Sequence, residues 1–199
     1  MTEPSIDARI QSGGGWIQTF TGKAFPVLDP RPDDVVIDDI AHALSMLCRF
    51  TGHVRTFYSV AQHCVLVAEV VRRFQPENRP LHLAALLHDA AEAYIQDLPR
   101  PIKRLNGIRA FYKPVEEVVE EAIRARFFVP TAVWGSPAIK VADEMLLRTE
   151  CRDLMGPLHP AWSRELHPDH GTTMPERIVP WSPQEAEERF LARFDELTA

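Results

Sequence analysis

The sequence predicts an all-α protein with one short N-terminal β-hairpin, and three observations support this. From residue 37 onward, apolar residues recur at helical spacing, as at Ile37, Ile40 and Leu44. Aromatic and β-branched residues surround Gly22 in the segment 16–28, the only pattern in the chain that is typical of a hairpin. The chain has 199 residues, of which 45% are hydrophobic, so one domain with a sizeable core is expected.

The domain organisation follows from composition along the chain. The first 15 residues are polar and end in three glycines, so they are expected to form a flexible leader. The rest is expected to be a single domain over 16–199. Its expected parts are a hairpin at 16–30, a helical core at 38–155, a Pro-rich loop at 156–183 and a C-terminal helix at 184–198.

The helices of the core are predicted from apolar periodicity and from the prolines that end them. The segment 80–94 is apolar nearly all round, so it belongs in the middle of a bundle. The prolines between 156 and 183 exclude long helices there and indicate an irregular excursion over the surface. The predicted helices cover 37–48, 59–74, 80–94, 108–128, 136–154 and 183–197.

The bulk composition excludes several classes of protein. A formal net charge of -6 argues against long nucleic acid as a partner, because polyanion binders usually carry positive charge. The three cysteines form no CxxC pair, so neither a zinc ribbon nor a disulfide framework is expected. No stretch approaches the roughly 20 apolar residues of a membrane span, and no signal peptide pattern is present, so a cytoplasmic protein without membrane partners is expected.

His88 and Asp89 are polar residues in the most apolar stretch of the chain. A buried carboxylate without a partner is very costly, whereas a bound cation removes that penalty. Taken alone, the pair is weak support for a metal site, because a helical histidine is more often a satisfied core residue. Two further positions strengthen the prediction. His63 interrupts the apolar stripe of the helix at 59–74, and Asp143 faces inward on the helix at 136–154.

Together these four residues predict a site for one divalent ion. Two imidazoles and two carboxylates suit a borderline or hard cation such as Mn²⁺, Co²⁺, Zn²⁺ or Mg²⁺. The ligand types leave the identity of the ion open.

The order His, His-Asp, Asp resembles that of the HD superfamily of metal-dependent phosphohydrolases. The run HDAAEAYIQDLPRPIK resembles the HDxxExxxxDLPxPxK signature of bacterial 5'-deoxynucleotidases, and YSVAQHCVLVA resembles their segment with the first ligand histidine. The resemblance covers about residues 40 to 155. Phage-type deoxynucleoside triphosphohydrolases that act on dATP share the same ligands and resemble RFTGHVRTFYSVAQH at least as well.

The resemblance implies roles for individual residues. It makes His63, His88, Asp89 and Asp143 the metal ligands of an HD-domain helical bundle. It places Glu92 and Asp97 at the catalytic acidic positions. Residues implied to bind substrate are Arg49 for the phosphate or sugar, Phe50 for stacking on a base, Pro101 for lining the base pocket and Lys103 for the phosphate.

For some of these residues a structural role competes with the functional one. Phe50 is equally well explained as a core aromatic at a helix end. Lys103 belongs to a cluster of cations between Pro99 and Lys113 that contains no acidic residue and could recruit phosphate. For the other cations of this cluster, a solvated helix face is the more ordinary explanation.

The function expected from these residues is hydrolysis at the α-phosphorus of a nucleotide. The motif favours a 5'-deoxynucleotidase acting on deoxyribonucleoside monophosphates. The alternatives are a deoxynucleoside triphosphohydrolase that releases triphosphate and, in another class, an inactive nucleotide-binding HD protein. The resemblance also implies a homo-oligomer, either a dimer or a larger assembly.

Overall fold

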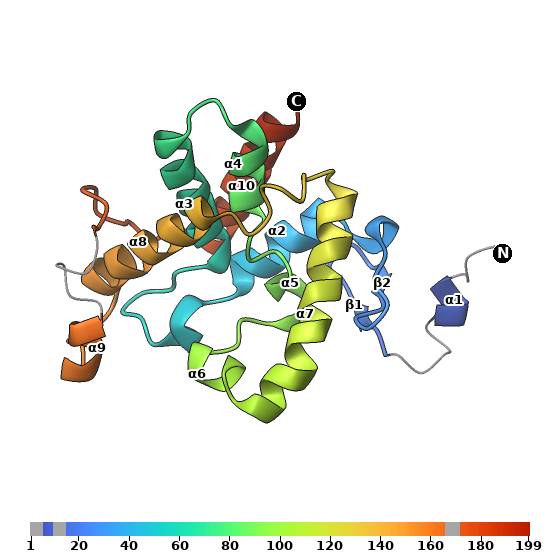
Figure 1. Ribbon diagram of the computed structural model, residues 1–199, viewed down its shortest axis with the longest axis horizontal. Helices are drawn as coiled ribbons and strands as arrows, with labels where there is room; N and C mark the ends of the chain where they lie inside the picture. Colours follow the sequence, from blue (N-terminus) through green and yellow to red (C-terminus); the bar gives the residue numbers. More distant parts are fainter. Residues whose placement is uncertain (1–5, 10–14, 166–171) are drawn as a thin grey trace.

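The computed structural model describes residues 6–9, 15–165 and 172–199, which form a helical bundle with a small hairpin at one side (Figure 1). This is the all-α class with a short N-terminal β-hairpin, as the apolar spacing predicted. In chain order the elements are α1 (Ile6–Arg9), β1 (Ile17–Gln18), β2 (Ala24–Phe25), η2 (Pro32–Asp34), α2 (Ile37–Met46), η3 (Arg49–Gly52), α3 (Val60–Phe74), α4 (Arg79–Leu86), α5 (Glu92–Ile95), α6 (Arg100–Lys103), α7 (Asn106–Arg126), α8 (Pro137–Leu154), α9 (Pro160–Glu165) and α10 (Pro183–Thr198).

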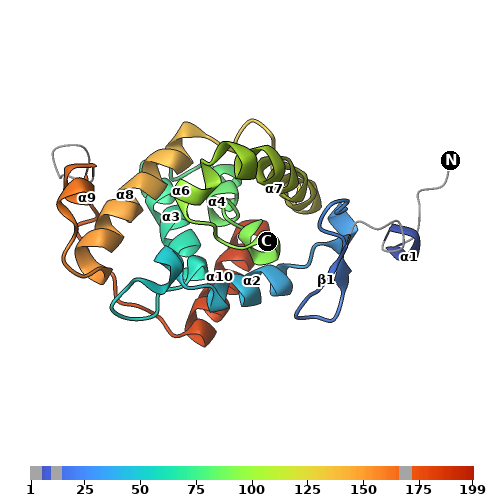
Figure 2. The ribbon, with the colours of Figure 1, turned by 90° about the horizontal axis from the view of Figure 1, so that it is seen from below.

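Helices α3 and α10 form the centre of the bundle. α3 packs against α4 and α8, and α10 packs against α2, α3 and α4. Val67 and Val71 of α3 and Phe190 of α10 are fully buried at these contacts. Burying one such side chain contributes about 1.5–3 kcal/mol, so the apolar stripes determine how the helices pack. In both ribbon views, α8 and α9 lie at one end of the long axis and the hairpin lies toward the other (Figures 1 and 2).

The predicted continuous helix over 80–94 is wrong in its middle. α4 ends at Leu86, and α5 begins only at Glu92. The chain between them forms successive tight turns with i→i+3 backbone hydrogen bonds, such as that from Ala90 N to Leu87 O at 3.0 Å. The apolar pattern runs through this break because the turns are largely buried as well. Apolar spacing alone could therefore not locate the helix end. His88 and Asp89 are turn residues.

The hairpin pairs β1 and β2 antiparallel, with Ile17 opposite Phe25. Its turn contains Gly22 in the left-handed region at φ 84°, a conformation that glycine adopts without a Cβ clash. Parts of the expected leader, residues 1–5 and 10–14, lie outside the described residues. At Arg9 the leader is anchored to the domain, since its guanidinium forms two hydrogen bonds of 2.8 and 2.9 Å with the Asp34 carboxylate.

The Pro-rich segment contains the short helix α9 and returns to the bundle along α3 and α8. Residues 166–171 of this expected loop lie outside the described residues. The Gln62 side chain of α3 donates to Val179 O at 2.8 Å and accepts from Trp181 N at 2.8 Å. The Asp153 carboxylate of α8 accepts from Ile178 N at 2.9 Å. The returning chain is therefore fixed by side chains of α3 and α8.

Within the described ranges, no helix combines the length and the apolar character that crossing a bilayer would require.

Candidate metal centre

His63 is positioned by the start of α3. The Ser59 hydroxyl accepts a hydrogen bond from Gln62 N at 3.1 Å, which caps the helix. The His63 side chain is fully buried, and its Nδ1 lies 2.7 Å from Glu150 Oε1 on α8. A carboxylate at this distance holds the proton on Nδ1, so the lone pair of Nε2 faces inward. His63 Nε2 is buried and has no hydrogen-bond partner in the described part of the chain.

His88 is oriented by the end of α4. Its Nδ1 lies 2.8 Å from Ala85 O, a carbonyl of the last helical turn that has no intrahelical partner once the helix stops. The carbonyl can only accept, so Nδ1 carries the proton and Nε2 presents its lone pair. His88 Nε2 is also buried without a hydrogen-bond partner among the residues described. The helix break that apolar spacing did not predict is thus what orients this histidine.

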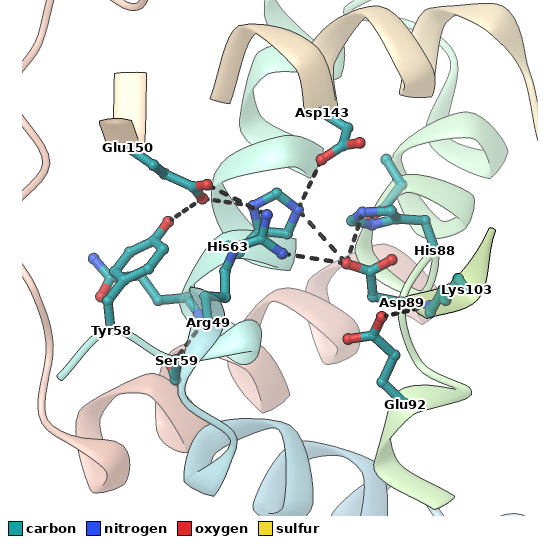
Figure 3. A network of polar contacts seen from close by, with 12 residues as sticks. Arg49, Tyr58, Ser59, His63, His88, Asp89, Glu92, Lys103, Asp143 and Glu150 are labelled. Carbon is teal, nitrogen blue, oxygen red and sulfur yellow. Dashed lines mark hydrogen bonds and ion pairs between the residues drawn. The ribbon is translucent and has the colours of Figure 1, made fainter. Parts of the chain in front are cut away.

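Two carboxylates meet these two nitrogens (Figure 3). Asp89 Oδ2 lies 3.6 Å from His63 Nε2 and 3.3 Å from His88 Nε2. Asp143 Oδ1, from α8, lies 3.3 Å from His63 Nε2. Donors that each lie about 2.1 Å from a shared ion are separated from one another by roughly 3.0 to 3.4 Å. The observed separations are close to this range, and the ligand atoms of His63, His88 and Asp143 lie within 4.8 Å of one another.

These four side chains therefore fit a divalent metal ion. Two buried imidazole nitrogens without partners would be costly to leave in a protein interior, and a cation bound between them removes that cost. The ring nitrogens and carboxylate oxygens are the donor set of borderline and hard divalent ions. The structure brings together all four residues that the sequence predicted as ligands.

Opposite charges shift the pKa values in this cluster. Burial would raise the pKa of Asp143, but the adjacent His63 imidazole, 3.3 Å away, holds it at about 2. Burial would likewise raise the pKa of Asp89, and the His88 and His63 imidazoles hold it well below its usual range. Both carboxylates are therefore ionised at neutral pH, as metal coordination requires.

Glu150 is a central residue of the site that the sequence analysis missed. Its side chain is completely buried on α8 and accepts hydrogen bonds from the Tyr58 hydroxyl at 3.0 Å and from His63. Its second oxygen lies 3.3 Å from an Arg49 nitrogen. The other terminal nitrogen of Arg49 lies 3.6 Å from Asp89 Oδ2. Glu150 thus connects a ligand histidine with a guanidinium beside the centre, a role that outer-shell carboxylates often have at metal sites.

The sequence did contain a signal for Glu150. It follows Asp143 by seven residues, which is two helical turns, so both side chains lie on one face of α8. Periodicity placed Asp143 on the inward face, and the same argument applies to Glu150.

Glu92 and Lys103 form an ion pair next to the ligands. Lys103 Nζ lies 3.4 Å from Glu92 Oε1 and 3.2 Å from Glu116 Oε1. Burial and the charges of Asp89 and Asp97 raise the pKa of Glu92 well above its usual value. The second oxygen of Glu92 is buried without a hydrogen-bond partner among the described residues. Asp97 is half-buried just after α5.

The two predicted base-contacting residues are placed differently. Phe50 follows Arg49 in η3, and both Phe50 and Thr51 adopt the left-handed conformation, at φ 56° and 54°. Its ring packs edge-on against Trp162 of α9 at a centroid distance of 6.2 Å. Pro101 is exposed in α6, so burial gives no support to its predicted role in a base pocket.

An apolar groove of about 630 Å³ lies elsewhere, between α5 and the first half of α7. Its lining includes Tyr94, Ile108 and Phe111 but none of the four ligands. The groove is therefore distinct from the candidate metal centre.

Comparison with known proteins agrees with this geometry. The family profile described as HD domain matches residues 60–199, which include all four predicted ligands. Over 183 residues the chain is 40% identical to Uncharacterized protein YfdR of Escherichia coli (strain K12), covering 92% of this chain and 96% of that protein. Over 147 residues it is 37% identical to an uncharacterized protein of Rhodobacter capsulatus, covering 71% of this chain and 74% of that protein. These similarities define the family but not the substrate.

Proposed function

Because the chain belongs to the HD superfamily of metal-dependent phosphohydrolases, we propose that it hydrolyses deoxynucleotides at the α-phosphorus, with 5'-monophosphates as its preferred substrates. One observation carries the proposal. Two buried imidazole nitrogens that have no hydrogen-bond partner among residues 6–9, 15–165 and 172–199 converge with Asp89 and Asp143, directly beside the Glu92–Lys103 pair. A metal site with an acid and a cation at its edge supports phosphoester hydrolysis better than a purely structural role.

A divalent ion held by His63, His88, Asp89 and Asp143 would supply Lewis acidity, which makes water more acidic and offsets charge on phosphoryl oxygens. The protein's own residues would position the substrate and transfer the protons. Arg49 and Lys103 would hold the phosphate in line with the attacking water, which lowers the entropic part of the barrier. Arg49 is positioned for this role because its guanidinium lies beside the candidate ligands, 3.6 Å from Asp89.

Glu92 would accept the proton of the attacking water. Its unpartnered Oε2 is the free acceptor, while Oε1 is held by Lys103. The pKa of Glu92 is raised above the usual value and so lies closer to neutral pH. A general base is most effective when its pKa is near the pH at which the enzyme works. The water oxygen would bond to phosphorus as the bond to the 5'-oxygen breaks, and Asp97 would deliver a proton to that oxygen. The products are a deoxynucleoside and phosphate.

The test is phosphate release from a panel of deoxynucleoside monophosphates by the purified protein with Mn²⁺, Co²⁺ or Mg²⁺. We expect Glu92→Gln and Asp97→Asn to lower kcat by about 100-fold or more, the range of general acid–base catalysis. The matched control is Glu117→Gln, which removes an exposed carboxylate of α7 that pairs only with Lys113 at 3.2 Å in the described structure. Full activity in either site variant contradicts the assigned roles.

Triphosphates are the second candidate substrates. Arg100 and Arg104 are exposed on and just after α6, on either side of Lys103 in sequence, and could bind the additional phosphates. Release of tripolyphosphate instead of phosphate from dATP would favour this alternative. Tight nucleotide binding without product under any of these metals would replace both proposals with a binding function.

A further inference from the structure

Cys64 lies at the candidate metal centre, although the residues that follow it in α3, Val65 to Ala68, are apolar. It directly follows the ligand His63 on α3, and its side chain is fully buried. Its Sγ and one ligand atom each of His88 and Asp89 lie within 4.8 Å of one another. The centre therefore contains two overlapping groups of donors. One consists of His63, His88 and Asp143, and the other consists of Cys64, His88 and Asp89.

The two groups differ in chemical softness. The first offers only nitrogen and oxygen, which suit Mn²⁺, Co²⁺ and Mg²⁺. The second includes sulfur, which favours Zn²⁺ and other thiophilic ions such as Cd²⁺. Both groups share His88, whose Nε2 is buried without a hydrogen-bond partner in the described structure. The fully buried Nε2 of His63 also faces this centre without a hydrogen-bond partner in the part of the chain that the structure describes, so the interior is suited to receive a cation.

We propose that Cys64, His88 and Asp89 form a second cation position, selective for thiophilic divalent ions such as Zn²⁺ and Cd²⁺. Because His88 and Asp89 are also ligands of the ion that supports hydrolysis, a thiophilic ion bound at the second position competes with that ion. Coordination uses the thiolate, so the thiol proton leaves to solvent on binding. The proposal concerns metal choice and does not depend on which substrate is hydrolysed.

Cys151 provides the matched comparison. It is also a buried cysteine in a helix, but its Sγ lies 3.7 Å from the Met155 sulfur and belongs to neither donor group. Burial alone would make Cys64 and Cys151 equivalent. If the proposal is right, Cys64 binds a thiophilic cation and Cys151 does not.

The experiment is titration of the full chain, stripped of metal with a chelator, with Cd²⁺ and separately with Mn²⁺. Binding is followed by calorimetry and, for Cd²⁺, by the ultraviolet charge-transfer absorption of a cadmium–thiolate bond. We expect this absorption in the wild type and in Cys151→Ser, and its loss in Cys64→Ser. Cd²⁺ affinity should fall at least about tenfold in Cys64→Ser, since loss of even an outer-shell partner can weaken binding by 10 to 100-fold. Mn²⁺ affinity should change by less than about twofold.

Two results overturn the proposal. One is a thiolate absorption that is absent in the wild type or persists in Cys64→Ser. The other is a parallel loss of Cd²⁺ and Mn²⁺ affinity in a folded Cys64→Ser protein, which would mean that the substitution damages the whole centre. Cys64→Ala serves as the second variant if serine in this apolar position prevents folding. No nucleotide is present in the titration, so its outcome is separate from that of the hydrolysis assay.

Discussion

Replacing Glu150 by glutamine removes one negative charge from the interior while almost preserving the shape of the side chain. The carboxylate has three partners, which are Tyr58, His63 and Arg49, at 3.0, 2.7 and 3.3 Å. Burial would raise the pKa of Glu150, but the Arg49 and His63 charges lower it below the usual value, so the wild-type residue is ionised at neutral pH. The substitution therefore changes all three interactions at once.

The expected effect follows from these contacts. A glutamine oxygen can still accept one of the hydrogen bonds from Tyr58 or His63, but its amide NH₂ cannot pair with the donors of Arg49. Removing one partner of a buried charge pair costs about 3–5 kcal/mol, and the retained hydrogen bond and the remaining Asp89 contact of Arg49 offset part of this. We expect the free energy of unfolding to fall by about 2–4 kcal/mol. Metal affinity should fall by about 10 to 100-fold because His63 loses the carboxylate that fixes its tautomer.

Urea denaturation measures the first quantity, and calorimetric titration with Mn²⁺ measures the second. The exposed Glu117→Gln variant is the control, and it should stay within about 0.5 kcal/mol of wild type because a surface ion pair contributes little. A Glu150→Gln protein with wild-type stability and wild-type Mn²⁺ affinity would refute the assignment of Glu150 as the residue that positions His63.

Three further predictions concern other parts of the molecule. Burial would raise the pKa of Asp153, but hydrogen bonds from Arg152, Ile178 N and Arg177 hold it at about 2. The contribution of Asp153 to the free energy of unfolding is therefore fully present above the usual pKa of an aspartate and is lost as the pH falls through about 2. Wild type should lose about 1–2 kcal/mol more than Asp153→Asn between about pH 4 and pH 2 in acid-dependent urea titrations, and parallel pH profiles would contradict this. Thr51→Asn should raise the free energy of unfolding by about 0.5–1 kcal/mol, because Thr51 is exposed in the left-handed region, which asparagine tolerates better; a lower urea midpoint would count against backbone strain there. Mn²⁺ at about 100 times its Kd should stabilise wild type by about 2.7 kcal/mol, which corresponds to roughly 5–10 °C in Tm for a domain of this size. The shift should fall by more than half in Asp143→Asn, and an equal shift in both proteins would place the ion elsewhere.

Sequence patterns predicted most helices and the four residues that the structure brings together as candidate ligands, because the helical spacing and the inward positions of His63 and Asp143 are encoded locally. The break after Leu86 could not be predicted in this way. Both the helix and the following turns are largely buried, so the pattern of apolar residues does not change where the backbone does. The helix end depends on a tertiary requirement, namely that His88 and Asp89 reach the same centre.

The contacts of Cys64 and Glu150 with the four predicted ligands could be established only from the packing of the helices. Cys64 directly follows His63, but adjacent helical residues point about 100° apart, so the sequence did not suggest that both side chains reach the same centre. The turn at 87–91 makes this possible, because it brings His88 and Asp89 close to both residues. Glu150 could have been found from its spacing to Asp143, whereas its bonds to Tyr58 and Arg49 join segments that are far apart in the sequence.

The separation of the ligands along the chain affects how the protein opens. His63, the turn at 87–91 and Asp143 belong to three segments that the backbone connects only through long stretches of intervening chain. A bound cation would act as a non-covalent crosslink among them, so α8 could not separate from α3 without first releasing the ion. Amide hydrogen exchange along α8 should therefore slow when the ion is added, including at residues that contact neither the ion nor any ligand. A bound ion would therefore also determine which parts of the bundle open together.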